Sequence, residues 1–118
     1  MTHHMILGRD CFPLAYDGIK EFDIKPYINE YQLIEDNETI TIEDELTGCF
    51  YTAVITRINY FVSLDDAFEI YNYKKILPYA FTKEHAMEIL RDIGNFKMNE
   101  INHGVVVFKM TRISEIVE

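Results

Sequence analysis

The sequence predicts an α+β fold, in which a small mixed or antiparallel β-sheet curls into a barrel with two or three helices packed outside. The 118 residues suit a single domain, 1–118, and 48% of them are hydrophobic, which is ample for one core. Alternation typical of strands occupies the first half and the end of the chain, and two helical periods lie between them. The expected order of elements is therefore β-α-β-β-β-α-α-β, with no linker or repeat.

The first elements are a strand, a short helix and a second strand. We expect the first strand at residues 4–7 and a helical turn at residues 10–17. In that turn Asp10 is a candidate N-cap, Pro13 is tolerated early in the helix, and Gly18 is a C-terminal stop. The next strand is predicted at residues 20–25.

A β-hairpin is predicted next. Residues 37–43 alternate polar side chains with Ile40 and Ile42, as in a half-buried strand. The sequence "DELTG" makes the turn, and residues 49–61 form a long β-rich run. Because this run is apolar on both faces through its middle, we expect it at the centre of the sheet.

Two amphipathic helices and a final strand follow. Ser63 and Thr82 are the expected N-caps of the helices, and Gly94 ends the second one. A helical spacing of i, i+3, i+4 and i+7 gives each helix one apolar stripe, made of Leu64, Ala67, Phe68 and Tyr71 in the first, and Ala86, Ile89, Leu90 and Ile93 in the second. Residues 104–113 return to a strand.

The chain is strongly acidic, with 20 Asp and Glu against 11 Lys and Arg and a formal charge of −9. Nonspecific binding of duplex DNA needs many cationic contacts to phosphates, so we do not expect it here. Any anionic partner has to be met by a small local cluster of cations, which favours a compact ligand. The alternative is that the acidity only maintains solubility.

Cysteine usage and hydropathy indicate a reduced, cytoplasmic protein. Cys11 and Cys49 form no Cys-x-x-Cys pair or zinc spacing, although a disulfide between them is an alternative. The sequence shows no signal peptide and no apolar run long enough for a membrane span. His3 and His4 lack a third ligand at a suitable spacing, so we expect no metal and no cofactor.

The segment Gly18–Lys25 carries a resemblance to a known family. Together with "HHMILGRDCFPLAYDGIKEFDIK", "ETITIEDELTG" and "HGVVVFKM", it resembles the ASCH domain family of the PUA-like superfold, whose members carry a Gly-x-Lys-x-x-(Glu or Thr)-x-Arg segment after the first strand and short helix. The resemblance covers nearly the whole chain in its order of elements. It implies a PUA-like barrel with a cleft that binds RNA or a nucleotide-like ligand.

This chain departs from the family at two places. Lys25 stands where the family usually has arginine, which replaces a planar two-pronged grip by a point charge. The Gly-Asp that commonly precedes the hairpin strand is replaced by "EDNE" at residues 35–38. Some members hydrolyse acetylated cytidine with a lysine, a threonine three residues later and a glutamate. Lys20 matches that lysine, Asp23 stands at the threonine position, and no glutamate is assigned.

Five residues are candidates for the site. Strand alternation places Lys20 in one row with Phe22 and Ile24, and Asp23 with Lys25 on the other face. We expect Lys20 at the rim of a concave pocket, above Phe22 and Ile24 packed against Ile40, Ile42 or Val107. Further candidates to converge on it are Lys25, Arg57 and Arg9. The alternatives are that Lys20 only covers the barrel end, Asp23 and Lys25 form a surface ion pair, and Arg57 is a solvated strand-end residue.

Three functions remain open. The first is a PUA-like binding module that recognises a nucleotide-like small molecule or an unpaired or modified RNA base through a cleft with Lys20 and Lys25. The second is an amidohydrolase acting on an acylated nucleoside such as acetylcytidine, with Lys20 and Asp23 as catalytic residues. The third is an acidic interaction or inhibitor protein that binds a basic protein partner. A membrane partner is not expected.

Overall fold

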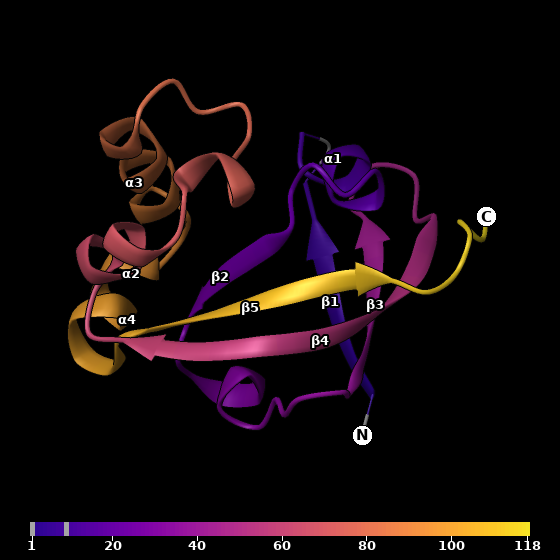
Figure 1. The fold of residues 1–118 in the computed structure, drawn as a ribbon, viewed down its shortest axis with the longest axis horizontal. Helices are drawn as coiled ribbons and strands as arrows, with labels where there is room; N and C mark the ends of the chain where they lie inside the picture. Colours follow the sequence, from indigo (N-terminus) through magenta and orange to yellow (C-terminus); the bar gives the residue numbers. More distant parts are fainter. Residues whose placement is uncertain (1, 9) are drawn as a thin grey trace.

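The computed structural model describes residues 2–8 and 10–118, which form a curled five-stranded half-barrel and four α-helices (Figure 1). The strands are β1 (Thr2–Leu7), β2 (Phe22–Pro26), β3 (Thr39–Asp44), β4 (Phe50–Phe61) and β5 (Val105–Arg112). The helices are α1 (Phe12–Tyr16), α2 (Leu64–Ile70), α3 (Lys83–Arg91) and α4 (Phe96–His103), and two short 3₁₀ turns span Asn29–Gln32 and Tyr73–Lys75. The predicted α+β class is confirmed.

The sheet is mixed and has two free edges. Its strand order is β1-β3-β4-β5-β2, and among the strand pairs of the described residues only β1–β3 is parallel. The predicted hairpin is present as β3 and β4, and β4 lies at the centre of the sheet as expected. The two edge strands, β1 and β2, are not hydrogen-bonded to each other, so the barrel stays open along a seam between them. This seam is where the candidate site lies.

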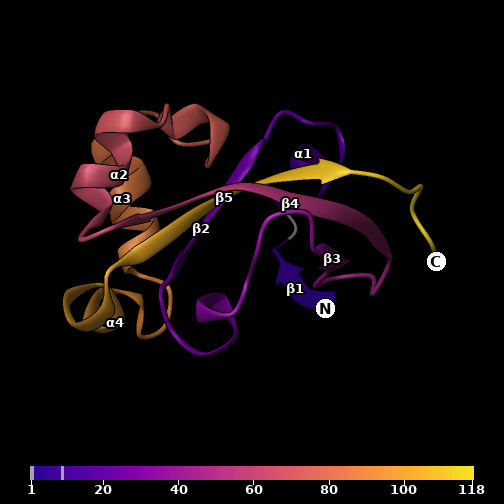
Figure 2. The ribbon, with the colours of Figure 1, turned by 60° about the horizontal axis from the view of Figure 1, so that its bottom comes forward.

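The helices are unequally distributed over the sheet. Figures 1 and 2 both show α2, α3 and α4 grouped at one end, beside β2 and β5, whereas α1 lies at the other end near β1 and β3. Two hydrophobic clusters result. One fills the concave face of the sheet around Ile42, Tyr51 and Phe108, and the other joins β2 and β5 to the helices around Ile24 and Val107.

The helix starts agree with the sequence rules except at α1. Ser63 accepts a hydrogen bond from Asp66 N, and Thr82 accepts one from His85 N, so both are the N-caps predicted for α2 and α3. At α1 the prediction of Asp10 is wrong, because Cys11 occupies the N-cap position and its side chain makes no capping bond.

Helix α4 was not predicted from the sequence. Gly94 suggested the end of one helix, and the following Asn95 makes no side-chain capping bond that would mark the start of another. The helix is also weakly amphipathic, because Met98 is 63% and Ile101 is 72% exposed. Its anchor is polar: the buried Glu100 carboxylate accepts hydrogen bonds from Leu64 N (2.8 Å) and from Arg91 Nε (2.9 Å).

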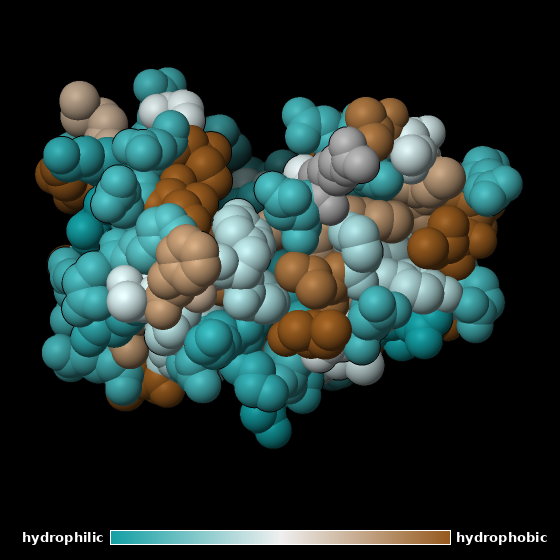
Figure 3. Space-filling view, turned by 90° about the horizontal axis from the view of Figure 1, so that it is seen from above, coloured by the Kyte–Doolittle hydropathy of each residue, from teal (hydrophilic) through white to brown (hydrophobic). Residues whose placement is uncertain are grey.

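The outer surface offers no single dominant apolar face in the view from above. Figure 3 shows hydrophobic side chains there in separate groups, set in a mostly hydrophilic surface. Among residues 2–8 and 10–118, no helix combines the length and the apolar character that crossing a bilayer requires.

Candidate ligand-binding cavity at the sheet seam

Lys20 enters the interior from a bend that precedes β2. Gly18 adopts a left-handed conformation (φ +80°), and the N–H groups of Ile19 and Lys20 both donate to Leu14 O, in the middle of α1. Glu21 N then donates to Lys75 O, and regular strand geometry begins only at Phe22. Because Lys20 lies outside the strand, the alternation of strand side chains between the two faces does not determine where its side chain points.

The Lys20 ammonium is buried and fully engaged. The residue is 1% exposed, and its Nζ donates to Ile76 O (2.6 Å) and Phe22 O (2.9 Å) and lies 3.2 Å from Asp23 Oδ1. Three oxygen acceptors match the three donors of an ammonium group. Lys20 therefore joins the bend, β2 and the 3₁₀ turn at Tyr73–Lys75.

The hydrogen bond from Lys20 Nζ to Phe22 O also satisfies one backbone group on the free edge of β2. Glu21 O accepts from Met110 N and Tyr27 N donates to Gly104 O, so the odd-numbered residues of this ladder bond to β5. The even-numbered Phe22 and Ile24 consequently turn their backbone groups to the free edge. Lys20 satisfies the carbonyl of Phe22 there, and Ile24 remains beside the cavity.

Asp23 is a buried carboxylate held between two lysines. It is 5% exposed, with Lys20 Nζ at 3.2 Å from Oδ1 and Lys25 Nζ at 3.4 Å from Oδ2. Burial by itself raises the pKa of Asp23, but the charges of Lys20 and Lys25 together outweigh it and lower the pKa below its usual value. In turn, Asp23 raises the pKa of Lys25. Asp23 Oδ2 nevertheless has no hydrogen-bond donor among the described residues.

A cavity of about 480 Å³ opens beside this trio, at the seam between β1 and β2. Its walls come from the end of β1, from β2, and from the helical end of the molecule. The lining residues used below are Leu7, Cys11, Lys20, Asp23, Lys25, Glu45, Leu77, Tyr79, Asn95 and Phe96. This volume lies within the range of small-molecule sites, which are mostly apolar with a few converging polar groups.

The structure brings together three of the five predicted site residues. Lys20, Asp23 and Lys25 all line the cavity. Arg57 does not: it is exposed, in an irregular part of β4 between Thr56 and Asn59, with a φ of +51°. Arg9 lies outside the described residues.

The sequence rules misplaced the charges within this group. Lys20 was expected at a pocket rim and opposite Asp23, but it is buried and paired with Asp23, because strand alternation does not extend to it. The Asp23–Lys25 pair was an alternative for the surface, yet the Asp23 side chain is buried, and that of Lys25 is 26% exposed. Ile24 pairs with Val107 as expected, whereas Ile40 and Ile42 belong to the other hydrophobic cluster.

Sequence reasoning missed Cys11 and Tyr79 as cavity residues. The Cys11 thiol lies 4.0 Å from Tyr79 Oη, across the cavity wall. Burial raises the pKa of the Cys11 thiol, and burial likewise raises the pKa of Tyr79 to about 12. Both groups are therefore neutral at pH 7. No local motif marks them, because they meet only through the packing of α1 against the segment before α3.

The remaining candidates take structural roles. Cys11 and Cys49 are both free thiols. His3 Nε2 lies 2.9 Å from Glu38 Oε1, and His4 Nε2 lies 3.0 Å from Glu43 Oε1. Both pairs connect β1 to residues of, or just before, β3. Within the described part of the chain, no three His, Cys, Asp or Glu side chains are grouped to hold a metal.

Comparison with known proteins gives the fold alone. No family model matches the chain, and no curated protein matches its sequence. Solved structures match its fold, and one of them is hypothetical protein PH0355, with a TM-score of 0.82 at 19% identity, covering 96% of this chain and all of that one. Protein PF0455 from Pyrococcus furiosus has a TM-score of 0.75 at 17% identity, covering 98% of this chain and all of that one. This chain therefore has the fold of these two proteins over almost its entire length.

Proposed function

We propose that the seam cavity binds a nucleoside-like ligand or a single unpaired or modified base, and that Asp23 and Lys25 recognise it. One observation carries the proposal: Asp23, a residue of the cavity lining, has a buried carboxylate oxygen, Oδ2, that lies 3.4 Å from Lys25 Nζ but accepts no hydrogen bond from the described residues. A buried acceptor of this kind costs free energy when it is left unsatisfied. A ligand N–H group that reached it would gain a charge-assisted hydrogen bond worth about 1.5–3 kcal/mol.

The neighbouring Lys25 indicates that such a ligand would carry an acceptor group beside its donor. Its Nζ is a donor 3.4 Å from the Asp23 acceptor, so the cavity presents a donor and an acceptor side by side. Nucleobases carry complementary donor and acceptor groups along one edge, and carboxylates accept from exocyclic amino groups. Tyr79 and Phe96 add aromatic surface to the walls, which suits a flat ring.

The charge balance favours the base over a phosphate as the group that is recognised. Lys20 and Lys25 both neutralise Asp23, which leaves one net positive charge in the trio, and Glu45 on the same cavity offsets it. The sequence suggested these lysines as the binding site of an anionic ligand, but in the structure they form ion pairs with a buried carboxylate of the protein itself. The ASCH resemblance of Gly18, Lys20 and the following residues points to the same kind of ligand.

The geometry supports binding better than hydrolysis. Lys20 already uses three acceptors, so it offers no free lone pair to act as a base. Asp23 has a lowered pKa, which makes it a weak general base near neutral pH. The amidohydrolase and the acidic interaction protein both remain predictions from the sequence.

The test is titration calorimetry with a panel of nucleosides against the wild type and Asp23→Asn. We expect amino-bearing nucleosides to bind the wild type and to bind Asp23→Asn at least about tenfold more weakly, because the ionised acceptor is lost. Glu45→Gln, which removes a charge from the same cavity and leaves Asp23 Oδ2 in place, is the matched control and should bind within about threefold of the wild type, since an exposed charge contributes little.

Two outcomes contradict the proposal. One is that no nucleoside in the panel binds the folded wild type at millimolar concentration. The other is that Asp23→Asn and Glu45→Gln bind equally well. A parallel incubation with acetylcytidine, followed by chromatography, tests the alternative function, because release of cytidine by the wild type but not by Asp23→Asn would favour hydrolysis.

A further inference from the structure

The segment of residues 71–83, which joins α2 to α3, differs in charge from the rest of the chain. It contains three of the 11 basic residues, Lys74, Lys75 and Lys83, and no Asp or Glu, although the whole chain has a charge of −9. Lys75 is paired with Glu21. Lys74 and Lys83 form no ion pair with the described residues, although the Lys74 ammonium lies 5.9 Å from the centroid of the Tyr73 ring, so no carboxylate neutralises their charges.

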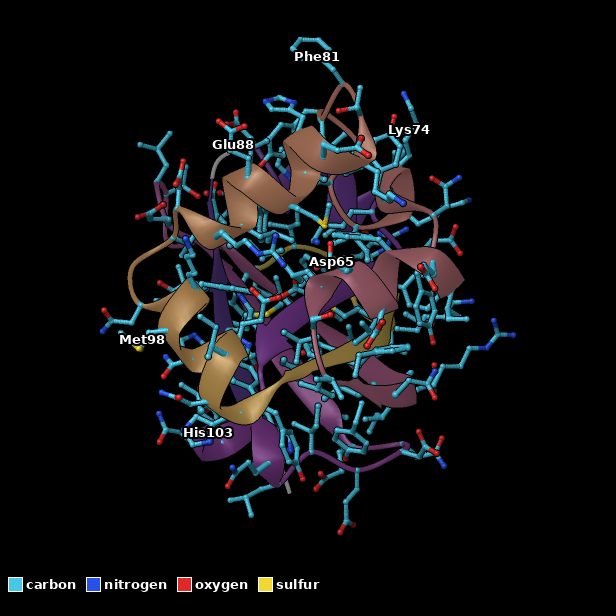
Figure 4. All side chains as sticks on the ribbon, turned by 90° about the vertical axis from the view of Figure 1, so that its left-hand side faces the viewer. Asp65, Lys74, Phe81, Glu88, Met98 and His103 are labelled. Atoms are coloured by element: carbon cyan, nitrogen blue, oxygen red, sulfur yellow. The ribbon has the colours of Figure 1, made fainter. Side chains whose placement is uncertain are left out.

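An aromatic side chain projects from the same segment. Phe81 is 83% exposed, and Figure 4 shows it extending from the end of the molecule that also carries Lys74. An exposed phenylalanine has to be held in place if it is to serve as a contact. Three interactions hold Phe81: its N–H donates to His85 Nδ1 (3.0 Å), its carbonyl accepts from Tyr73 Oη (3.0 Å), and its ring stacks on the His85 imidazole.

The stacking leaves one face of the Phe81 ring open. The two ring centroids are 5.2 Å apart with an interplanar angle of 10°, so the imidazole lies offset against part of one face, and the high exposure of Phe81 leaves the other face to solvent. An exposed aromatic face in the same segment as lysines without a carboxylate partner suits single-stranded nucleic acid, since bases stack on such a ring and phosphates meet the cations. An acidic peptide would use the lysines but not the ring.

The segment also leads to the cavity. Leu77 and Tyr79 are cavity-wall residues, and Tyr79 is only two residues from Phe81. We propose that residues 71–83 dock a single-stranded nucleic acid, with a base on the open face of Phe81 and phosphates at Lys74 and Lys83. This inference rests on the proposed function, because the bound nucleic acid would carry the base that enters the cavity.

The experiment measures binding of a fluorescein-labelled RNA of about eight nucleotides, an order of length matched to compact single-strand sites, by anisotropy over a series of salt concentrations. Two phosphate contacts predict a log–log salt slope of about −1.4 for the wild type, and Lys74→Ala should reduce it by about 0.7. Phe81→Ala should weaken binding roughly 5- to 150-fold through the loss of one stacked base. Both side chains are exposed, so the variants should fold normally.

Matched controls separate the contributions. Phe81→Leu keeps an apolar side chain but has no aromatic face, and should weaken binding almost as much as Phe81→Ala. Lys97→Ala removes an exposed lysine from α4 and should leave both affinity and slope unchanged. The inference is wrong if Phe81→Ala or Lys74→Ala binds the RNA as the wild type does, or if a poly-glutamate peptide binds with the same dependence on Lys74 and none on Phe81.

The same set of proteins distinguishes this inference from the proposed function. If free nucleosides bind in an Asp23-dependent manner and the RNA does not bind, the docking surface is wrong and the cavity proposal stands. If RNA binds through Phe81 and Lys74 while Asp23→Asn changes neither RNA nor nucleoside binding, the docking surface stands and the cavity proposal is wrong.

Discussion

Replacing Lys20 by methionine tests the central arrangement of the site. Methionine has a similar length and no charge, so the substitution leaves Asp23 buried with a single counter-ion, Lys25 at 3.4 Å. The carbonyls of Phe22 and Ile76 lose their donor at the same time. Lys20→Met should therefore destabilise the fold strongly through the loss of these polar contacts, because methionine keeps an apolar side chain of similar length.

The magnitude follows from these contacts. Removing one partner of a buried ion pair costs about 3–5 kcal/mol, and the lower end applies here because Lys25 remains. The two carbonyls that lose this donor add at least about 1 kcal/mol together. The expected loss is about 4 kcal/mol at pH 7, a large part of the roughly 5–15 kcal/mol that a domain has available.

Urea denaturation followed by circular dichroism measures this loss. With a slope of about 2 kcal/mol per molar urea, the midpoint of Lys20→Met should fall by about 2 M. The double variant Lys20→Met/Asp23→Leu removes the buried carboxylate and leaves only the part-exposed Lys25 without its partner, so it should recover at least about 2 kcal/mol. A loss below about 1 kcal/mol in the single variant, or no recovery in the double variant, would refute the reasoning.

The pH dependence provides an independent check. In the wild type the pKa of Asp23 lies below its ordinary value of 3.8, so its ion pairs contribute stability that is complete above pH 3.8 and is lost as the pH falls through the lower folded-state value. Without Lys20, burial opposes the charged form of Asp23 with less compensation. The stability difference between wild type and Lys20→Met should consequently narrow as the pH falls below 3.8.

Three further variants test other parts of the structure. Gly104→Ala should cost several kcal/mol in the same urea assay, because the position has a φ of +75° and the new Cβ would lie 2.5 Å from a backbone oxygen. Gly18→Ala, at φ +80° but in open space, should cost about 1 kcal/mol. Glu100→Gln should lower the thermal midpoint by at least about 5 °C, because it weakens the charged anchor that joins three helices. His3→Leu, which removes the donor, should make the loss of stability between pH 4.5 and about 2 less steep, because the hydrogen bond with His3 is the largest of the contributions that lower the pKa of Glu38 to about 2; an unchanged acid limb would contradict this.

Most of the fold could be predicted from the sequence because its signals are local. The hairpin of β3 and β4 follows from alternation around Ile40 and Ile42, and the starts of α2 and α3 follow from the hydroxyl caps at Ser63 and Thr82. Helix α4 gives no such signal, because its stability comes from Glu100, whose partners lie 9 and 36 residues away.

The candidate site was predictable only in part. The Gly18–Lys25 pattern located Lys20, Asp23 and Lys25 in one region, and the structure places all three on one cavity. It could not show that Lys20 faces Asp23, because that depends on where β2 begins, and the bend held by Leu14 O decides this. Tyr79 reaches the cavity through packing between distant segments, which no spacing along the chain records.

The position of β2 in the sheet has a consequence for the order of folding. Within the part of the chain that the structure describes, its one sheet partner is β5, and the paired residues Phe22 and Lys109 or Pro26 and Val105 are about 80 to 90 positions apart along the chain. Closing so long a loop is slow compared with forming the β3–β4 hairpin, whose strands are neighbours. We therefore expect β2 to join the sheet last, so that Asp23 becomes buried only after the other strands have paired. Pulse-labelling hydrogen exchange should show the amides of β3 and β4 protected before those of Asp23 and Lys25, and simultaneous protection would contradict this order.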